Sequence, residues 1–413
     1  MNKFRFNNSQ NSDGLRSSRI HAQYRSIATS LLGALLILSS GCKVTVDGVV
    51  TDPTATPTPA PLPSPNPAPR AVTQFVMAID QNSSQNSIKT FSVGTGGALT
   101  LAQTHNIASV GNYVVGHPNL NFVYALTAGG GALSAYAISA NGTLTELSSS
   151  PYSLANYHEH LIVEPRGRFL YSTDNATGNV DVFQISQTTG ALSLVPSSGS
   201  CGSNCLATMQ AVDPAGKFLY VAAQGSDGAT NGIYAFAINQ TTGAVSGLAG
   251  SPYLFTSEGN GPYRLVVSGD GRFLVSGNTG NTGNYGGLIS GFSSFSINSA
   301  TGQITYIGSL QAGVYPLQMT TDSSGHIYAA DNASGNLLNV QLSSSGMPTV
   351  TTVVAASAGG AAVDLSGNYI YGSTGSTSTI SQSRFTTAPA ATPLSPATVS
   401  IASPFGLGIA TYR

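Results

Sequence analysis

One motif returns along most of the chain, and its spacing limits the folds that the chain can adopt. It is a turn, usually holding Pro or Gly, followed by a short apolar strand that ends in Tyr or Val. The copies are His117–Tyr124, Glu164–Tyr171, Asp213–Tyr220 and Ser268–Val275, with weaker ones at Asp322–Tyr328 and Asp364–Tyr371. Aligned on the turn, they stand 47, 49, 55, 54 and 42 residues apart. This period is typical of a four-stranded blade.

The remaining strands of each blade follow the same period. A strand with alternating apolar residues recurs at Ser87–Val93, Gly232–Ile238 and Gly291–Ile297. Alternation of this kind predicts a sheet strand. A turn that contains Gly then leads to a fourth strand, at 141–144, 189–192, 242–245 and 301–304. Glycine suits such turns because a positive φ costs it little.

A count of these strands predicts how the repeat closes on itself. Seven second strands are present, beginning with Gln74–Asp80, and seven first strands are present only if the last is Phe405–Tyr412. The two ends of the domain would then complete one blade and leave no open sheet edge. We therefore predict an all-β, seven-bladed β-propeller of four-stranded antiparallel blades over residues 71–413.

Composition excludes several other classes of protein. Charged residues make up only 8% of the chain, Gly occurs 48 times and Trp is absent. Such a chain is neither a coiled coil nor a helical bundle nor a charged disordered tail. Its formal net charge of -1 argues against a nucleic-acid partner, because neutralising phosphates requires clustered Lys and Arg.

The first 41 residues have the pattern of a secretory signal peptide. Five basic residues lie within the first 26 positions, and an apolar run, Ile27–Leu38, leads to Ser39-Ser40-Gly41-Cys42. The run is too short to span a bilayer. Its Gly-Cys ending resembles a bacterial lipobox, in which Cys42 would carry the lipid, although Ser39 stands where that motif usually has Leu. An ordinary secreted protein cleaved nearby is the alternative.

A lipid-anchored, Pro/Thr-rich linker is predicted for residues 42–70. Positions 51–70 contain eight prolines, and such a segment is stiff and extended, at about 3.1 Å per residue. We expect an exported protein of the cell envelope that meets the membrane through its anchor, at the outer membrane or facing the periplasm in a Gram-negative cell. In an oxidising compartment, Cys201 and Cys205 would close a small disulfide loop.

The repeat motif resembles that of one propeller family. The absence of Trp speaks against WD-repeat, kelch and sialidase-like propellers. The order Pro-x-Gly-[Lys/Arg]-Phe-Leu-Tyr, then Phe-x-Ile, then Thr-Gly-x-Leu instead resembles the lactonase-type propeller family, which includes bacterial 6-phosphogluconolactonase and a fungal carboxymuconate-lactonizing enzyme. The resemblance covers nearly all of 71–413, and it implies the fold more strongly than the activity because the motif is mainly structural.

Chemistry-bearing residues gather where first strands begin and second strands end, the face that forms a propeller's funnel. Candidate catalytic residues are His158, His160, Asp174 and Arg264, and candidate substrate-binding residues are Glu159, Glu258 and Tyr263. Opening a lactone requires a base for water and a donor or cation for the oxyanion. His158 or His160 would be the base, and Arg264 would clamp an anionic group.

Several positions depart from the family pattern. His158 and His160 lie seven and five residues ahead of Pro165, where the family has its His six ahead. The family's Gly-Pro-Arg-His reads Gly-Pro-Tyr263-Arg264, and Thr279 stands where an acid is expected, whereas Asp174 matches. These changes suggest a retained funnel with altered chemistry.

Simpler interpretations stand beside the catalytic one. His158 and His160 could instead make polar funnel contacts or share a metal ion, since alternate strand residues point the same way. Arg264 could pair with Glu258. The repeated segments 174–179 and 331–336 resemble calcium loops but are read as turns. We expect no metal and no cofactor.

Two functional classes remain open. The first is an exported hydrolase, or a lactonizing isomerase, that acts on lactones of sugar acids or related small molecules. The second is a non-catalytic propeller that binds a ligand or protein, or serves as a scaffold, in the cell envelope. His, Arg and acid converging within hydrogen-bond reach would favour the enzyme, and a shallow face of Ser, Asn and Tyr would favour binding.

Overall fold

The computed structural model describes residues 72–413, apart from 83–84, 197–198, 203–204, 226–230, 255–260, 280–289, 323, 356–358, 375–377 and 388–389. The predicted signal peptide, Cys42, the predicted linker and Glu258 lie outside the described residues. Strands dominate the described part, which also contains the short 3-10 helix η1 (Ala128–Gly130). No helix in it is long and apolar enough to cross a membrane.

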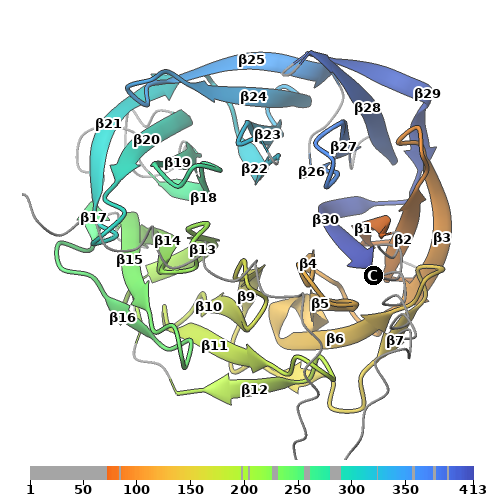
Figure 1. The fold of residues 1–413 in the computed structure, drawn as a ribbon, viewed down its shortest axis with the longest axis horizontal. Coiled ribbons are helices and arrows are strands. Elements are labelled where there is room, and N and C mark those ends of the chain that lie inside the picture. The colour runs from red at the N-terminus through yellow and green to blue at the C-terminus, as the bar shows by residue number, and fades with distance from the viewer. Residues whose placement is uncertain are drawn as a thin grey trace, which may run out of the picture. The chain divides into compact units, whose positions relative to one another are not determined.

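Seven antiparallel sheets form a ring, and we number them as blades 1 to 7 in chain order (Figure 1). The innermost strands of blades 1 to 7 are β30 (Pro404–Tyr412), β4 (Tyr113–Gly116), β9 (His158–Val163), β13 (Cys205–Val212), β18 (Pro262–Val267), β22 (Pro316–Thr321) and β26 (Gly360–Val363). The second strands are β1 (Thr73–Asp80), β5 (Phe122–Thr127), β10 (Phe169–Asp174), β14 (Phe218–Gly225), β19 (Phe273–Asn278), β23 (Ile327–Asp331) and β27 (Tyr369–Thr374).

The outer half of each blade completes the sheet. The third strands are β2 (Ser87–Val93), β6 (Ala132–Ile138), β11 (Val180–Ile185), β15 (Gly232–Ile238), β20 (Gly291–Ile297), β24 (Asn336–Leu342) and β28 (Thr379–Thr387). The fourth strands are β3 (Leu99–Asn106), β7 (Leu144–Glu146), β12 (Leu192–Val195), β16 (Val245–Gly247), β21 (Ile304–Gln311), β25 (Pro348–Ala355) and β29 (Ala390–Ser400). The predicted seven-bladed, all-β fold is confirmed.

Blades 2 and 4 refine the expectation of four strands each. A fifth short strand, β8 (Tyr152–Ser153) or β17 (Tyr253–Leu254), joins the sheet beside the fourth. In blade 2, β7 pairs with Tyr136–Ile138 of β6, and β8 pairs with residues 132–133 of the same strand. The outermost strand of these blades is therefore one edge built in two pieces.

The ring closes through blade 1, as predicted. β30 runs antiparallel to β1, with partners from Thr73 and Tyr412 at one end to Asp80 and Pro404 at the other. The backbone N–H of Ser403 also donates to the Asp80 carboxylate at 2.7 Å. Both long edges of β1 are thus paired, one with β2 and one with β30.

The recurrent tyrosines of the second strands join neighbouring blades. Each of four buried hydroxyls donates to the carbonyl oxygen of a glycine in the hairpin turn of the next blade, at 2.8–3.1 Å. The pairs are Tyr124 with Gly190, Tyr171 with Gly243, Tyr220 with Gly302, and Tyr371 with Gly97. In these four blades the tyrosine of the motif thus has a buried hydroxyl whose partner lies on the neighbouring blade.

The same hairpin glycines also make room for an aromatic ring of the preceding blade. A Cβ atom on Gly243 would lie 2.3 Å from a ring carbon of Phe169, and one on Gly190 would lie 2.4 Å from Phe122. Gly243 also has a positive φ of 77°. The Phe ring of the motif thus packs directly against the Gly of the next blade's hairpin, where a larger residue would clash.

The loop ahead of β13 contains a disulfide between Cys201 and Cys205, whose Cα atoms lie 5.7 Å apart. Both residues are buried and belong to the apolar cluster between blades 3 and 4.

Candidate functional site

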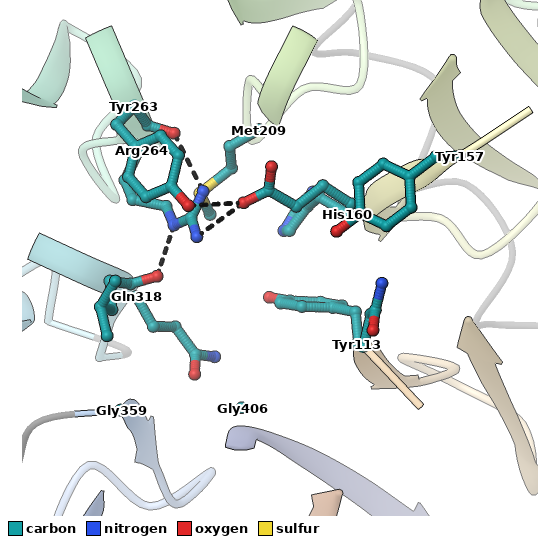
Figure 2. A pocket seen from close by; sticks show the side chains of 12 residues that line it. Tyr113, Tyr157, His160, Met209, Tyr263, Arg264, Gln318, Gly359 and Gly406 are labelled. Carbon is teal, nitrogen blue, oxygen red and sulfur yellow. Dashed lines mark hydrogen bonds and ion pairs between the residues drawn. The ribbon is translucent and has the colours of Figure 1, made fainter. Parts of the chain in front are cut away.

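A cavity of about 220 Å³ lies where the innermost strands begin, and residues from all seven blades line it (Figure 2). Its lining residues are Asn112, Tyr113, Tyr157, Glu159, His160, Met209, Tyr263, Arg264, Leu317, Gln318, Gly359 and Gly406. Four of the predicted site residues, Glu159, His160, Tyr263 and Arg264, are therefore brought together in one place.

A local irregularity of the innermost strands aims these side chains. In blade 5 the pairing of β18 with β19 skips Tyr263, and in blade 6 the pairing of β22 with β23 skips Leu317. Such a bulge breaks strict alternation and turns a side chain to a new direction. As a result, the bulged residue and the residue after it both line the cavity, as Tyr263 and Arg264 do.

The centre of the site is an ion pair between blades 3 and 5. Arg264 Nη2 lies 3.0 Å from Glu159 Oε1, and the Tyr263 hydroxyl donates to the same oxygen at 2.8 Å. Both charged side chains are largely buried, with 10% of Arg264 and 19% of Glu159 exposed. Figure 2 shows the Tyr263 ring and the Arg264 guanidinium lying together at one side of the cavity.

The remaining nitrogens of Arg264 also have partners within the protein. Nε donates to the carbonyl oxygen of Leu317, and Nη1 donates to that of Tyr263 at 3.2 Å. The guanidinium carbon lies 3.7 Å from the centre of the Tyr263 ring. We expected Arg264 to bind an anionic group of a substrate. In the structure, its anionic partner is the Glu159 carboxylate of the protein itself.

His160 forms another wall of the cavity. Its Nδ1 lies 2.7 Å from the Gln210 side-chain oxygen, and its ring lies 4.2 Å from the ring of Tyr113. Burial lowers the pKa of His160 to about 3, against the opposing effect of the Gln210 hydrogen bond, and the nearby Arg264 lowers it further. The imidazole is thus neutral across the ordinary pH range, and Nε2 makes no hydrogen bond within the described residues.

His158 does not join His160 at the cavity. Between Leu161 and His158 the pairing of β9 with β10 shifts register, so the two imidazoles lie on different sides of the strand despite their i, i+2 spacing. His158 is fully buried, with Nδ1 2.8 Å from the Ser172 hydroxyl and Nε2 3.5 Å from Asp181 Oδ2. Burial lowers the pKa of His158 to about 4, although nearby Asp174 opposes the shift.

Asp174 shapes a turn and does not line the cavity. Its carboxylate accepts hydrogen bonds from the backbone N–H groups of Ala176 and Thr177, from the Thr177 hydroxyl and from the Asn156 amide. Burial by itself would raise the pKa of Asp174, but these donors outweigh it and hold the pKa below its usual value. Asp331 accepts equivalent bonds from Ala333 and Ser334, so both segments are turns.

Sequence reasoning missed Tyr113, Tyr157, Met209 and Gln318. The repeat itself contained a signal. In five successive blades, the residue four places before the first residue of the motif copy lines the cavity. Those residues are Tyr113, His160, Met209, Arg264 and Gln318. Gln318 is itself fixed, since its amide group donates to the Leu407 carbonyl oxygen at 2.7 Å and accepts from the Leu407 N–H at 3.1 Å.

Two other predicted features fall elsewhere. Thr279, at the position where an acid was expected, accepts a hydrogen bond from the Gln224 amide and is absent from the cavity lining. Among the described residues, no three His, Cys, Asp or Glu side chains gather in a way that would hold a metal ion.

Comparison with known proteins places the sequence among propellers of one kind. A family model described as lactonase, 7-bladed beta-propeller, matches residues 73–204. The 6-phosphogluconolactonase of Pectobacterium carotovorum subsp. carotovorum is 26% identical over 175 residues, which are 40% of this chain and 51% of that protein. The match thus spans about half the length of the curated relative.

Solved structures share the architecture at low identity. The periplasmic gluconolactonase of Pseudomonas aeruginosa superposes with a TM-score of 0.63 and 15% identity, covering 82% of this chain and 99% of that one. Hydrazine synthase of Kuenenia stuttgartiensis superposes with a TM-score of 0.55 and 13% identity, covering 75% and 95%. Proteins with such different names share this ring, so the likeness shows the fold alone.

Proposed function

We propose that this chain, a member of the lactonase-type seven-bladed β-propeller family, binds a lactone of a sugar acid or a related compound in the cavity and opens its ring by adding water. The observation that carries the proposal is the convergence of His160, Arg264 and Glu159 on one cavity at the mouth of the ring. A base-form imidazole and groups able to stabilise an oxyanion are the parts that ester hydrolysis uses.

The proposed step assigns one role to each group. His160 Nε2 takes a proton from a water molecule as the water oxygen adds to the lactone carbonyl carbon. The imidazole then gives this proton to the ring oxygen as the ring C–O bond breaks, which leaves the open hydroxy acid. Loss of water around Tyr113 raises the pKa of its hydroxyl to about 12, partly offset by Arg264 and by a Gln318 hydrogen bond. That hydroxyl therefore keeps its proton and donates to the oxyanion.

A matched pair of histidine variants tests the assignment. In pH-stat assays of the full chain on sugar and aliphatic lactones, His160→Ala should lower turnover at least about a hundredfold, in the range of a lost general base. His158→Ala, two residues away on β9 but off the cavity, should keep turnover within a few-fold. Equal loss in both folded variants, or no turnover by the native chain above the buffer, would reject the hydrolase.

A binding module is the second candidate, and a specific observation favours it. Every nitrogen of Arg264 already has a partner within the protein, and the low pKa of His160 makes it a weak proton acceptor. If lactones or sugars bind in the cavity and no lactone is opened faster than in buffer, the chain is a ligand-binding or scaffold propeller of the envelope.

We also propose that the chain is exported and anchored through a lipid on Cys42. The signal-like segment 1–41 and the Pro-rich segment that follows support this, and the Cys201–Cys205 disulfide fits an oxidising compartment. Expressed in a bacterium, the full chain should fractionate with membranes, whereas Cys42→Ser should leave the membrane fraction or remain unprocessed. An equal membrane fraction for both chains, with Cys42→Ser processed to the same length as the native chain, would exclude the anchor, and a soluble exported native chain would indicate ordinary secretion.

A further inference from the structure

We infer that the cavity selects uncharged ligands over acids and phosphate esters, and that Glu159 sets this preference by neutralising Arg264. The inference rests on the proposed function only in placing the ligand in this cavity. It concerns binding, so it can be tested whether or not the bound molecule reacts.

The charges of the cavity lining cancel. Of the twelve lining residues within the described part of the chain, Glu159 and Arg264 are the two that carry a formal charge, and their atoms lie 3.0 Å apart. His160 is neutral because burial holds its pKa near 3. The cavity therefore offers neither a net positive field for an anion nor a net negative field for a cation.

Contacts within the protein also occupy part of the Arg264 guanidinium. Recognition of a carboxylate or phosphate by Arg usually takes two parallel N–H donors from one edge of the fork. Here Nη2 serves Glu159, while Nε and Nη1 serve the carbonyl oxygens of Leu317 and Tyr263. These bonds use three of the five N–H donors of the guanidinium, and an anion that took the remaining two would lie beside the Glu159 carboxylate, which repels it.

The rest of the lining suits a polar, uncharged ring. Tyr113, Tyr157 and Tyr263 present both an aromatic face and a hydroxyl, and Gln318 and Asn112 add amide groups. Burial raises the pKa of Tyr263 to about 12, against the effect of Arg264, so its hydroxyl stays neutral, donates to Glu159 and can accept a hydrogen bond from a ligand. A polyhydroxylated ring that lacks a carboxylate or phosphate matches this set of groups.

Equilibrium binding with three stable probes tests the inference on the full chain. The probes are gluconolactam as an unreactive, uncharged ring, and gluconate and 6-phosphogluconate as anions. Isothermal titration of the native chain should show gluconolactam binding at least tenfold more tightly than either anion. Glu159→Gln should strengthen binding of both anions at least tenfold relative to gluconolactam, because it leaves the charge of Arg264 uncompensated.

Two further variants separate charge from contact. Tyr263→Phe removes a hydrogen bond to Glu159 without altering either charge, so the preference for the neutral probe should persist. Glu146→Gln removes an exposed carboxylate on β7, away from the cavity, and should change nothing. If Glu159→Gln does not fold, the native preference and Tyr263→Phe still decide the question.

The failure of this inference differs from the failure of the lactonase proposal. A native chain that binds an anion as tightly as gluconolactam, or that binds none of the three probes, overturns the inference. So does a folded Glu159→Gln chain that gains no anion affinity relative to gluconolactam. If gluconolactam binds but no lactone is opened, the hydrolase proposal is rejected and the inference about ligand charge stands. If anionic lactones are opened faster than neutral ones, the hydrolase proposal stands and the inference about ligand charge is rejected.

Discussion

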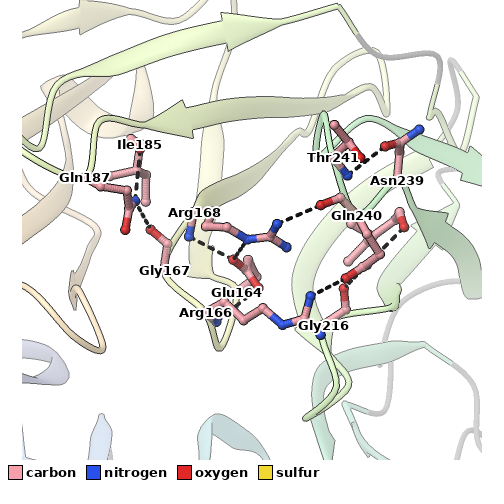
Figure 3. Close-up of polar contacts among 12 residues, drawn as sticks. Glu164, Arg166, Gly167, Arg168, Ile185, Gln187, Gly216, Asn239, Gln240 and Thr241 are labelled. Atoms are coloured by element: carbon pink, nitrogen blue, oxygen red, sulfur yellow. Dashed lines mark hydrogen bonds and ion pairs between the residues drawn. The ribbon is translucent and has the colours of Figure 1, made fainter. Parts of the chain in front are cut away.

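The two ends of the innermost strands are built on opposite principles. At the far end of β9 from the cavity, buried Glu164 accepts the backbone N–H groups of Arg166 and Arg168 and thereby holds the turn (Figure 3). Arg168 donates to the backbone carbonyl oxygen of Gln240 in the next blade at 2.7 Å. At the cavity end of the same strand, Glu159 accepts Arg264 from two blades away.

The difference lies in what repeats. At the turn end, Asp213 and Asp364 accept backbone N–H groups just as Glu164 does, so one contact recurs around the ring. At the cavity end, one backbone position carries a different side chain in each blade. The acceptor at the turn end therefore recurs between blades, whereas the side chain that lines the cavity differs between blades, although a single strand supplies both.

The largest expected effect comes from filling the contact between a hairpin glycine and the neighbouring ring. Gly243→Ala should lower the free energy of unfolding by about 3 kcal/mol or more, because it adds a clash with Phe169 to an unfavourable positive φ. Gly335→Ala is the matched control, with a φ of 67° but open space around its Cβ, and should cost about 1–2 kcal/mol. Urea unfolding followed by circular dichroism measures both, and equal losses would refute the packing argument.

Acid should lower the free energy of unfolding next most strongly. The folded-state pKa values of His158 and His160 lie near 4 and 3, below the ordinary 6.5, so only the unfolded chain takes up these protons as the pH falls below 6.5. Burial and Asp174 raise the pKa of Asp181 to about 6, so the folded state gains one compensating proton. The free energy of unfolding should fall by about 2 kcal/mol between pH 6.5 and 4.5.

A variant of His160 tests whether this residue causes the pH dependence of the free energy of unfolding. His160→Gln should reduce the dependence by about 1.4 kcal/mol per pH unit, the value of one proton. Unfolding measured at several pH values gives the slopes, and an unchanged slope in His160→Gln would show that this imidazole is protonated in the folded state.

Removing one hydroxyl at each end sharpens the contrast. Tyr220→Phe leaves the Gly302 carbonyl oxygen without its buried donor and should cost about 1–2 kcal/mol of stability, with ligand binding unchanged. Tyr263→Phe removes a hydroxyl of the cavity and should cost less than about 1 kcal/mol while altering ligand affinity. Urea unfolding and ligand titration measure both variants. If the two variants lose the same stability and the same ligand affinity, the two ends of the strands do not differ in role.

The smallest effect is expected at an exposed arginine of the turn end. Arg166 donates to the Gln240 side chain, but both are exposed at that contact, so Arg166→Ala should change the free energy of unfolding by less than about 0.5 kcal/mol. Arg168→Ala should cost about 1 kcal/mol, since it also loses a contact 5.2 Å above the Phe169 ring. A larger loss at Arg166 than at Arg168 would contradict this order.

Much of the fold could be predicted because the contacts that define it recur. The strand expected at Ser87–Val93 is β2, and the closing strand expected at Phe405–Tyr412 is β30, extended by one residue. The position of the cavity could be predicted too, because the innermost strands begin on the same face of the ring. Glu159, Tyr263 and Arg264 do meet there.

The roles within the site could not be predicted. Equal orientation of His158 and His160 was expected from alternation, but the bulge in β9 separates them, and no residue type announces that bulge. The Arg264–Glu159 pair joins residues 105 positions apart, whereas sequence proximity pointed to Glu258, which lies outside the described residues. Contacts made across a ring depend on the three-dimensional position of each blade, which a linear repeat does not encode.

The closure of blade 1 sets an order of events during synthesis. The contact between Ser403 and Asp80 spans 323 positions, so β1 leaves the ribosome long before its inner partner exists. Until β30 emerges, the nascent blades form an open arc whose first strand presents unpaired backbone groups along one edge. Such edges invite pairing with other chains, so a cell that makes this protein must shield β1 for nearly the whole time of translation.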